Sequence, residues 1–275
     1  MVLRKSLVCN FPGYIRFNQS TDDMLFIMWV ILKPDEIGRR NFRYLLKLIR
    51  EIRGLVFNMD IQKMCRLLYV RSKTLFQIND HLQKFAQIAK NSKEFQGHGW
   101  GCAFLRDGDW NIYKNINPIW KDDLHIFGTS NQLIAHARSA FKDQDLQLEN
   151  NMPFFNGDYI FVFNGELHGV KIKESGKIGA EKIFNYIMRF NKGNLEEAMQ
   201  RGIDNIRKRS RYVRAMNLII ADKKSAYVSS DFNEDPDYFT LFYQKSVEKL
   251  IISSEKYPDE ENWHKIEPRT VKVFK

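Results

Sequence analysis

The sequence of 275 residues has only three cysteines, Cys9, Cys65 and Cys102, and no Cys-x-x-Cys or Cys/His cluster. Disulfide scaffolds and zinc sites need more cysteines at closer spacing, so both classes are excluded. We expect no metal ion and no other cofactor. So few scattered thiols are typical of a protein from a reducing compartment, which favours a cytoplasmic location.

The sequence also lacks an apolar run long enough to cross a bilayer, which takes about 20 residues. The run Met24–Leu32 reaches about half that length, and Lys33-Pro34-Asp35-Glu36 follows it instead of a small-residue cleavage site. We therefore expect neither a signal peptide nor a membrane partner.

The net charge of +10 is unevenly distributed. Residues 1–63 carry 11 Lys/Arg against 6 Asp/Glu, whereas residues 64–275 carry 32 against 27. The larger part is only mildly basic, which argues against nucleic acid as a partner of the whole protein. A nucleic-acid-binding alternative rests on a basic amphipathic helix predicted at 35–56, and salt-sensitive binding that is lost on truncation to Met64 would indicate it.

Three interpretations of residues 1–63 stay open. The segment is a basic amphipathic helix for an acidic surface, a propeptide, or translated sequence upstream of the true start. We favour the last of these because the strongest motif of the chain begins directly afterwards, at Met64. The chain is therefore divided into an N-terminal extension, 1–63, and a domain, 64–275.

Residues 64–275 are rich in apolar and aromatic segments, as expected of a packed core. Period-two and period-3.6 patterns predict the elements of this domain. Helices are expected at 74–90, 179–190 and 194–209, and strands at 65–71, 101–105, 110–114, 132–140, 159–163, 216–221, 226–229, 239–243, 249–253 and 270–274. This order of strands, helices and strands predicts a layered α+β domain.

The pair Met64-Cys65 carries the chemistry that organises this domain. If translation starts at Met64 and the methionine is removed, Cys65 becomes the N-terminal residue. Its α-amine then titrates near 8, so a useful fraction is neutral at pH 7 and can accept the thiol proton. A single residue would thus supply both nucleophile and base. For an arbitrary buried cysteine, a place in a core strand is the commoner outcome.

Five motifs in order resemble the class II glutamine amidotransferase domain, a member of the N-terminal nucleophile hydrolases, in its stand-alone form. They are Met64–Leu68, Gly99-Trp100-Gly101, Ile134–Arg138, Asn164-Gly165 and the closing Trp263-His264-Lys265-Ile266-Glu267-Pro268. Each motif alone is weak, but their shared order covers residues 64–275. The resemblance implies the four-layer αββα sandwich of that superfamily.

The resemblance also implies roles for particular residues. Cys65 would be the nucleophile, and Asn164 and Gly165 would donate N–H groups to the tetrahedral oxyanion. Arg138 would hold the substrate α-carboxylate in a two-bond fork. Gly99 and Trp100 would shape the floor beside the nucleophile. His136 is expected to be a core histidine, since the α-amine of Cys65 already serves as base.

The chain departs from the family pattern at several positions. The family has Asp-Ser/Thr-Glu where this chain has Gly179-Ala180-Glu181, and that aspartate holds the substrate α-amino group. His98 stands where the family has the Asp of Asp-Gly-Trp-Gly, and Met152 and Phe163 each stand where the family has a His. Because Gly179 offers only backbone, we expect weak discrimination at the substrate α-amine unless Glu174 or Glu181 replaces the aspartate.

The resemblance implies a cytoplasmic hydrolase that cleaves the γ-amide of glutamine, or of a γ-glutamyl compound, through a Cys65 thioester. Glutamate and ammonia or an amine would be released, and a synthase partner would receive the ammonia. The alternative keeps the fold but loses turnover, as a binding or regulatory subunit. The change at Gly179 favours this alternative, whereas retention of Cys65, Arg138 and Asn164 opposes it.

Overall fold

The computed structural model describes residues 64–140 and 146–275. Cys9, the apolar run at 24–32 and the helix predicted at 35–56 lie outside these residues. The described residues belong to one compact unit. Within the described part of the chain, no helix is long and apolar enough to cross a membrane.

Two sheets form the centre of the domain, and all pairings between their strands are antiparallel. The first sheet has the order β11-β9-β10-β1-β4-β2-β3. Its strands are β1 (Arg66–Gln77), β2 (Trp100–Arg106), β3 (Asp109–Asn115), β4 (Thr129–Ala137), β9 (Phe242–Lys245), β10 (Lys249–Ser253) and β11 (His264–Lys265).

The second sheet has the order β12-β8-β7-β6-β5. Its strands are β5 (Phe154–Asn156), β6 (Tyr159–His168), β7 (Tyr212–Ala221), β8 (Ala226–Ser230) and β12 (Thr270–Phe274). The longest pairing joins β6 to β7 and places Asn164 opposite Asn217. The register of this pairing shifts between Glu166 and Leu167.

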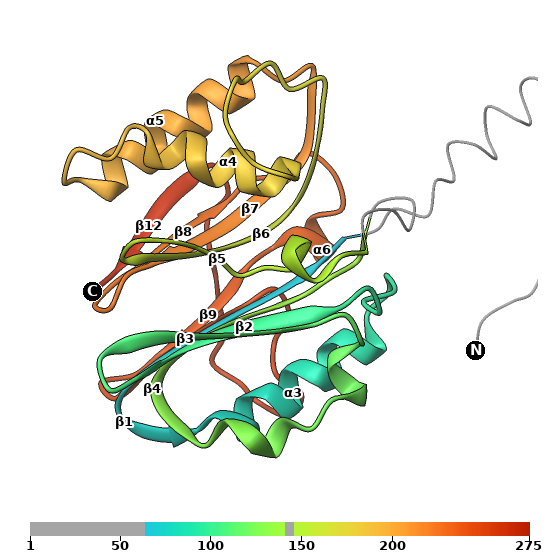
Figure 1. The fold of residues 1–275 in the computed structure, drawn as a ribbon, viewed down its shortest axis with the longest axis vertical. Coiled ribbons are helices and arrows are strands. Elements are labelled where there is room, and N and C mark those ends of the chain that lie inside the picture. Colours follow the sequence, from blue (N-terminus) through green and yellow to red (C-terminus); the bar gives the residue numbers. More distant parts are fainter. Residues whose placement is uncertain (1–63, 141–145) are drawn as a thin grey trace, which may run out of the picture. The chain divides into compact units, whose positions relative to one another are not determined.

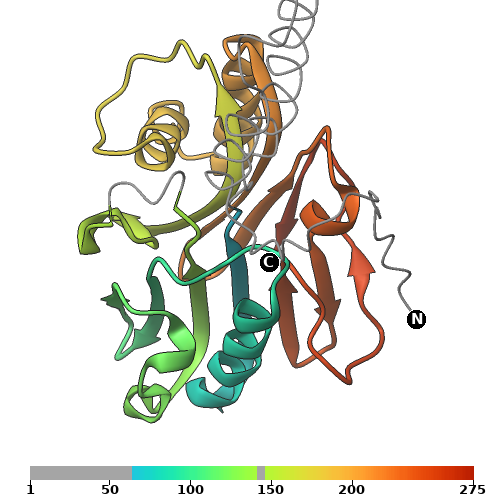
Figure 2. The same cartoon turned by 90° about the vertical axis from the view of Figure 1, so that its right-hand side faces the viewer.

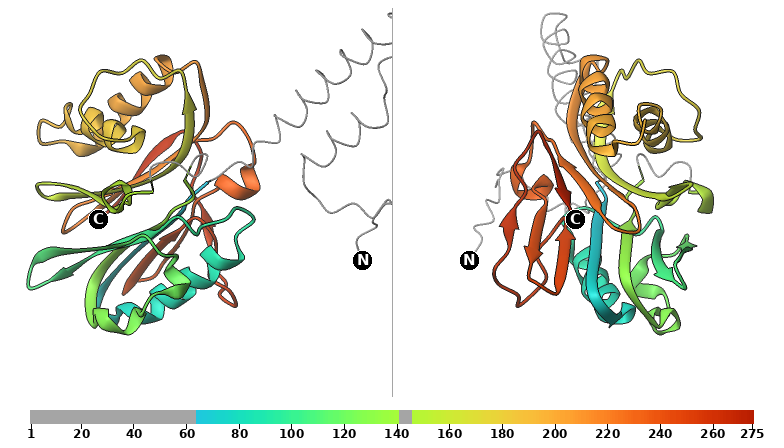
Figure 3. Two further views of the ribbon diagram at one scale, coloured as in Figure 1. Left: turned by 45° about the vertical axis from the view of Figure 1, so that its right-hand side comes forward. Right: turned by 90° about the vertical axis from the view of Figure 1, so that its left-hand side faces the viewer.

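Helices cover the outer faces of both sheets (Figures 1 and 3). Helix α3 (Ile78–Asn91) lies below the first sheet in Figure 1, whereas α4 (Gly179–Met188) and α5 (Leu195–Lys208) lie above the second. The expected four-layer αββα sandwich is therefore confirmed. A single turn, α6 (Pro236–Phe239), lies between β8 and β9 in the chain.

The core on the outer side of the first sheet is called here the α3-side core. Leu82 and Phe85 of α3 are fully buried in it, each stabilising the fold by about 1.5–3 kcal/mol. The first-sheet side chains that belong to this core include Leu68, Val70, Trp100, Cys102, Leu133 and Ile251.

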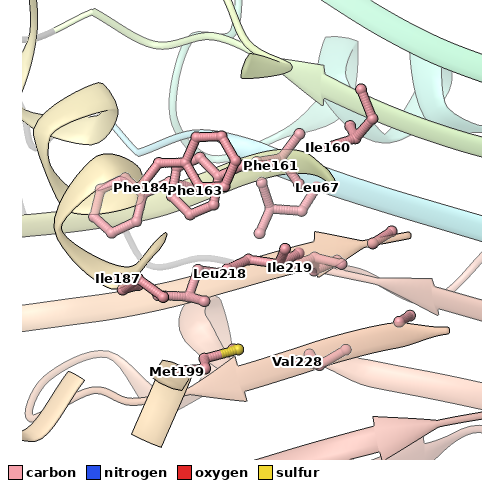
Figure 4. Close-up of a cluster of buried hydrophobic side chains, with 14 of the residues drawn as sticks. Leu67, Ile160, Phe161, Phe163, Phe184, Ile187, Met199, Leu218, Ile219 and Val228 are labelled. Atoms are coloured by element: carbon pink, nitrogen blue, oxygen red, sulfur yellow. The ribbon is translucent and has the colours of Figure 1, made fainter. Parts of the chain in front are cut away.

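A second core joins the two sheets and the helices α4 and α5. Figure 4 shows Phe161 and Phe163 of β6 beside Phe184 of α4, with Leu67 of β1 close by. The rings of Phe161 and Phe184 are stacked, with centroids 4.7 Å apart. This packing holds β6 firmly between α4 and the first sheet.

Three of the predicted elements need correction. The strand expected at 132–140 is β4, which runs from Thr129 to Ala137, so the last three residues of the prediction lie beyond its end. The helix expected from Thr74 begins at Ile78, because residues as far as Gln77 continue β1 and pair with β4. The strand expected at 239–243 is divided between α6 and β9, because Pro236 starts a helical turn after Asp235, whose φ is +47°.

Candidate active site

A pocket of about 510 Å³ collects residues from five separate stretches of the chain. Five of the seven predicted site residues line it, namely Cys65, Arg138, Asn164, Gly165 and Gly179. They come from the start of β1, the end of β4, the middle of β6 and the first turn of α4. Gly99 and Trp100 do not line this pocket.

Cys65 directly precedes β1 and lies against the end of β4. Its main-chain N–H donates to Asn164 Oδ1 over 2.9 Å. Its Sγ accepts from the main-chain N–H of Ser139 at 3.4 Å and lies 3.7 Å from the Ser139 carbonyl oxygen. Since Met64 precedes it in this chain, the nitrogen of Cys65 is a peptide nitrogen and cannot act as a base.

The pKa of the Cys65 thiol is raised to about 11, chiefly by burial. The N–H of Ser139 and the charge of Arg138 act in the opposite direction and favour the thiolate. The thiol is therefore protonated at pH 7 and needs a base before it can attack.

Asn164 is fully buried in β6. Its Oδ1 is occupied by the N–H of Cys65, whereas its Nδ2 has no hydrogen-bond partner among the described residues. A buried amide donor without a partner is rare and costly, so it is a candidate for receiving a ligand oxygen. The next residue is Gly165. Glycine is required here because a Cβ at this position would lie 2.3 Å from the carbonyl oxygen of Ala215.

Arg138 follows β4 and is nearly buried, with 8% of its surface exposed. Its guanidinium donates to Asn151 Oδ1 at 3.1 Å, and Asn151 in turn donates to the Asn115 carbonyl at 2.8 Å. Its main-chain N–H donates to Gly99 at 2.9 Å. The arginine at the pocket wall is thus oriented by neighbours on two sides.

The expected floor of Gly99 and Trp100 requires a correction. Gly99, at φ +101°, supports the backbone of Arg138 from behind the pocket, and a Cβ there would collide with Asn151. Trp100 is fully buried in the α3-side core, where its indole N–H donates to Asp122 at 2.8 Å. Strand alternation turns this side chain to the face opposite the site.

Gly179 is the first residue of α4, and the space where its Cβ would lie is open. The two acidic candidates to replace an aspartate here do not line the pocket. Glu181 accepts from the main-chain N–H of Lys177 at 2.5 Å, and Glu174 lies 3.9 Å from Arg189.

Sequence reasoning did not identify several residues of the pocket wall. Glu166, directly after Asn164-Gly165, bonds His168 at 2.7 Å and Arg214 at 3.3 Å through its two carboxylate oxygens. Its place beside the motif was a usable signal. Four further polar residues of the wall were also missed: Ser139, Asn150, His168 and Lys182. The remaining missed residues include apolar ones, and nothing in their spacing sets them apart from core positions: Leu167, Val170, Ile172, Ile178 and Ile183.

Two further residues of interest lie away from the pocket chemistry. His136 is fully buried in β4, and burial lowers its pKa to about 3, so the ring is neutral at pH 7. Cys102 is fully buried in the α3-side core, and burial raises the pKa of its thiol. The described residues contain no cluster of three or more His, Cys, Asp or Glu suited to a metal ion.

A scan of protein-family models and a search of curated proteins give no match to this sequence. Solved structures do match the fold. A glutamine aminotransferase class-II domain protein from Silicibacter pomeroyi superposes with a TM-score of 0.53 at 14% identity, over 76% of this chain and 98% of that one.

A predicted glutamine amidotransferase from Pseudomonas aeruginosa matches with a TM-score of 0.50 and 16% identity, covering 76% and 97% of the two chains. Glutamine phosphoribosylpyrophosphate amidotransferase from B. subtilis matches at 0.53 and 13% identity. The match covers 76% of the present chain and 49% of that enzyme.

The chain has the class II glutamine amidotransferase fold. Identities this low establish the class II fold alone.

Proposed function

We propose that this protein is a hydrolase of the class II glutamine amidotransferase type. Its nucleophile is Cys65, and its substrate is the γ-amide of glutamine or of a γ-glutamyl compound. The observation that carries this proposal is the convergence of Cys65, Asn164 and Arg138 on one pocket from separate strands. A thiol, a buried amide donor and a guanidinium together suit an amide substrate that carries a carboxylate.

The first step is attack on the amide. When the chain begins at Cys65, the α-amine occupies the place of the nitrogen that now lies 2.9 Å from Asn164 Oδ1. This amine takes the proton from Sγ as sulfur adds to the carbonyl carbon. The same proton then passes to the leaving nitrogen, the C–N bond breaks, and a thioester remains on Cys65.

Asn164 is suited to stabilise the tetrahedral intermediate. Its Nδ2 is a buried donor beside the nucleophile, and no described protein group occupies it. A donor of this kind contributes about 3–4 kcal/mol when it is directed at the developing oxyanion. The absence of a side chain at Gly165 lets the backbone of β6 run close to β7 at this point.

Water then resolves the thioester. The carbonyl carbon gains a water oxygen, the C–S bond breaks, and a proton returns to sulfur through the α-amine. Glutamate leaves together with the ammonia or amine of the first step. With glutamine as substrate, the ammonia would pass to a synthase partner in the cytoplasm.

The segment 1–63 controls this chemistry in the proposal. In the full chain the nitrogen of Cys65 is acylated by Met64 and the thiol is protonated, with a pKa of about 11. The full chain therefore binds substrate without hydrolysing it. In this form the protein corresponds to the alternative of a binding or regulatory subunit. The active form is the one whose mature chain begins at Cys65.

Intact mass and N-terminal sequencing of the natural protein, combined with ammonia release from glutamine and γ-glutamyl amides, test this proposal. We expect the active species to begin at Cys65, and we expect a glutamine-analogue electrophile to label that residue. Hydrolysis by a protein that still carries residues 1–63 would overturn the requirement for a free terminus. Labelling at Cys102 would overturn the assignment of the nucleophile.

A further inference from the structure

The pocket is more apolar than glutamine requires. Two segments supply most of the apolar wall: the end of β6 with the residues that follow it, and the chain from Ile178 into the first turns of α4. In Figure 2 the chain between these elements, drawn in yellow, arcs away from β6 before it returns to α4. Leu167, Ile172 and Ile178 pack against the core while remaining partly exposed at the pocket.

The size of the pocket points in the same direction. Its volume of about 510 Å³ lies within the range of about 300–1,000 Å³ typical of sites for drug-sized ligands. Glutamine is much smaller than such ligands. The pocket therefore has room for a second group beyond the amide and the carboxylate of the substrate.

The charges on the wall disfavour a free ammonium. Arg138 and Lys182 are both cationic, and Glu166 is the only carboxylate among the described residues that line the pocket. Both oxygens of Glu166 are engaged, one by His168 and the other by Arg214. An ammonium that is desolvated here without its own carboxylate would bind poorly.

Resting on the function proposed above, we propose that the substrate is a carboxylate-bearing amide whose α-nitrogen is acylated by an apolar group. Nα-acylglutamine is the simplest member of this class. Arg138 binds the carboxylate, the γ-amide lies at Cys65 and Asn164, and the acyl chain lies against Ile172 and Ile178. Hydrolysis yields the Nα-acylglutamate and ammonia through the same thioester.

Gly179 provides a way to reverse this selectivity. The position of its missing Cβ is open, and it lies at the first residue of α4, where a carboxylate is compatible with the helix dipole. An aspartate introduced at this point places a negative charge on the pocket wall without a collision. The variant Gly179→Asp should therefore bind a free ammonium better than the native protein does.

The test measures binding and turnover separately. Binding of glutamine and of Nα-butanoylglutamine is measured by calorimetry on the Cys65→Ala variant, both as the full chain and as the form that starts at Met64. Turnover of both compounds is measured as ammonia release by the form with Cys65 intact. We expect the acylated compound to bind at least about tenfold more tightly than glutamine, because its acyl chain buries apolar surface.

Two variants and one matched control sharpen the test. Ile172→Ser should reduce the preference for the acyl group about fivefold, and Gly179→Asp should shift it toward glutamine. Ile126→Ser makes the same substitution at a residue that is 58% exposed and absent from the pocket wall, and it should leave the preference unchanged. Thermal unfolding of each variant shows whether it is folded.

The outcomes separate this inference from the proposed function. Preferred binding of the acylated compound without any turnover supports the inference and contradicts the hydrolase assignment. Equal or tighter binding of glutamine overturns the inference while turnover supports the hydrolase. Failure of both compounds to bind also overturns the inference.

Discussion

The two cysteines of the described chain occupy opposite environments. Cys65 lies at the pocket, where the N–H of Ser139 contacts its sulfur and Arg138 favours its ionised form. Cys102 lies in the α3-side core, where burial raises its pKa and the charge of Asp122 raises it further. Burial raises the pKa of both thiols, yet only Cys65 has groups nearby that can stabilise a negative charge.

This difference teaches that burial alone does not make a cysteine inert. The polar groups beside it decide, because a thiolate or an oxyanion needs donors that are already in place. The pocket holds such donors in Asn164 and Ser139, whereas the α3-side core offers apolar packing around Cys102.

The largest expected effect comes from replacing each of the two cysteines by alanine in turn. In the form that starts at Met64, Cys65→Ala should reduce amide hydrolysis to background, a loss of about 1,000-fold or more. Cys102→Ala should retain most of the activity and cost about 1 kcal/mol of unfolding free energy. Ammonia release and chemical denaturation measure the two effects. Comparable activity losses would remove the distinction between the two environments.

A smaller but still large effect is expected at Asn164. Asn164→Ala should reduce kcat about 100-fold or more, because the oxyanion loses a buried donor. Asn164→Asp keeps the oxygen that accepts from Cys65 but removes the N–H donor, so it should lose a similar factor.

The matched control for Asn164 is Asn217, its direct partner across β6 and β7. Asn217 is equally buried, but it donates to Phe239 and accepts from Asp231 within the protein. Asn217→Ala should therefore lower the unfolding free energy by about 1–3 kcal/mol and leave kcat nearly unchanged. An equal loss of kcat in both variants would assign Asn164 a purely structural role.

The full chain should show the difference between the thiols directly. Because the pKa of Cys65 is about 11 instead of the ordinary 9.0, its thiolate fraction at pH 8 should be about 100-fold below that of a free thiol. Its alkylation rate should rise about tenfold for each pH unit up to about 11. Mass spectrometry after brief iodoacetamide treatment measures this rate, and Cys102 should stay unmodified in the folded protein.

The smallest effect is expected for Arg138→Lys. This change keeps the charge but loses the planar fork, so binding of every carboxylate-bearing ligand should weaken by about tenfold. KM should rise for glutamine and for its acylated analogue together while kcat changes little. If KM rose for only one of the two ligands, Arg138 would not be the group that binds the carboxylate that both ligands share.

Much of the fold could be predicted from the residues. The strands at 249–253 and 270–274 and the start of the helix at Gly179 agree with the structure, because apolar periodicity and local turns specify such elements. The end of β1 was wrong by several residues, since Phe76 and Gln77 are held extended by pairing with β4, far away in the sequence. Trp100 was misplaced for a related reason: its alternation in β2 decides which face of the sheet it occupies.

By itself, the sequence determined the chemical groups of the site and the α+β class, since thiol, amide and guanidinium are properties of residues and periodicity is local. Only the tertiary structure decided which groups meet. In the folded protein Glu166 lines the pocket with both carboxylate oxygens already hydrogen-bonded. Ile172 and Ile178 line the pocket as part of its apolar wall. These outcomes depend on how two sheets and α4 pack together, and such long-range packing is not encoded in the spacing of any one segment.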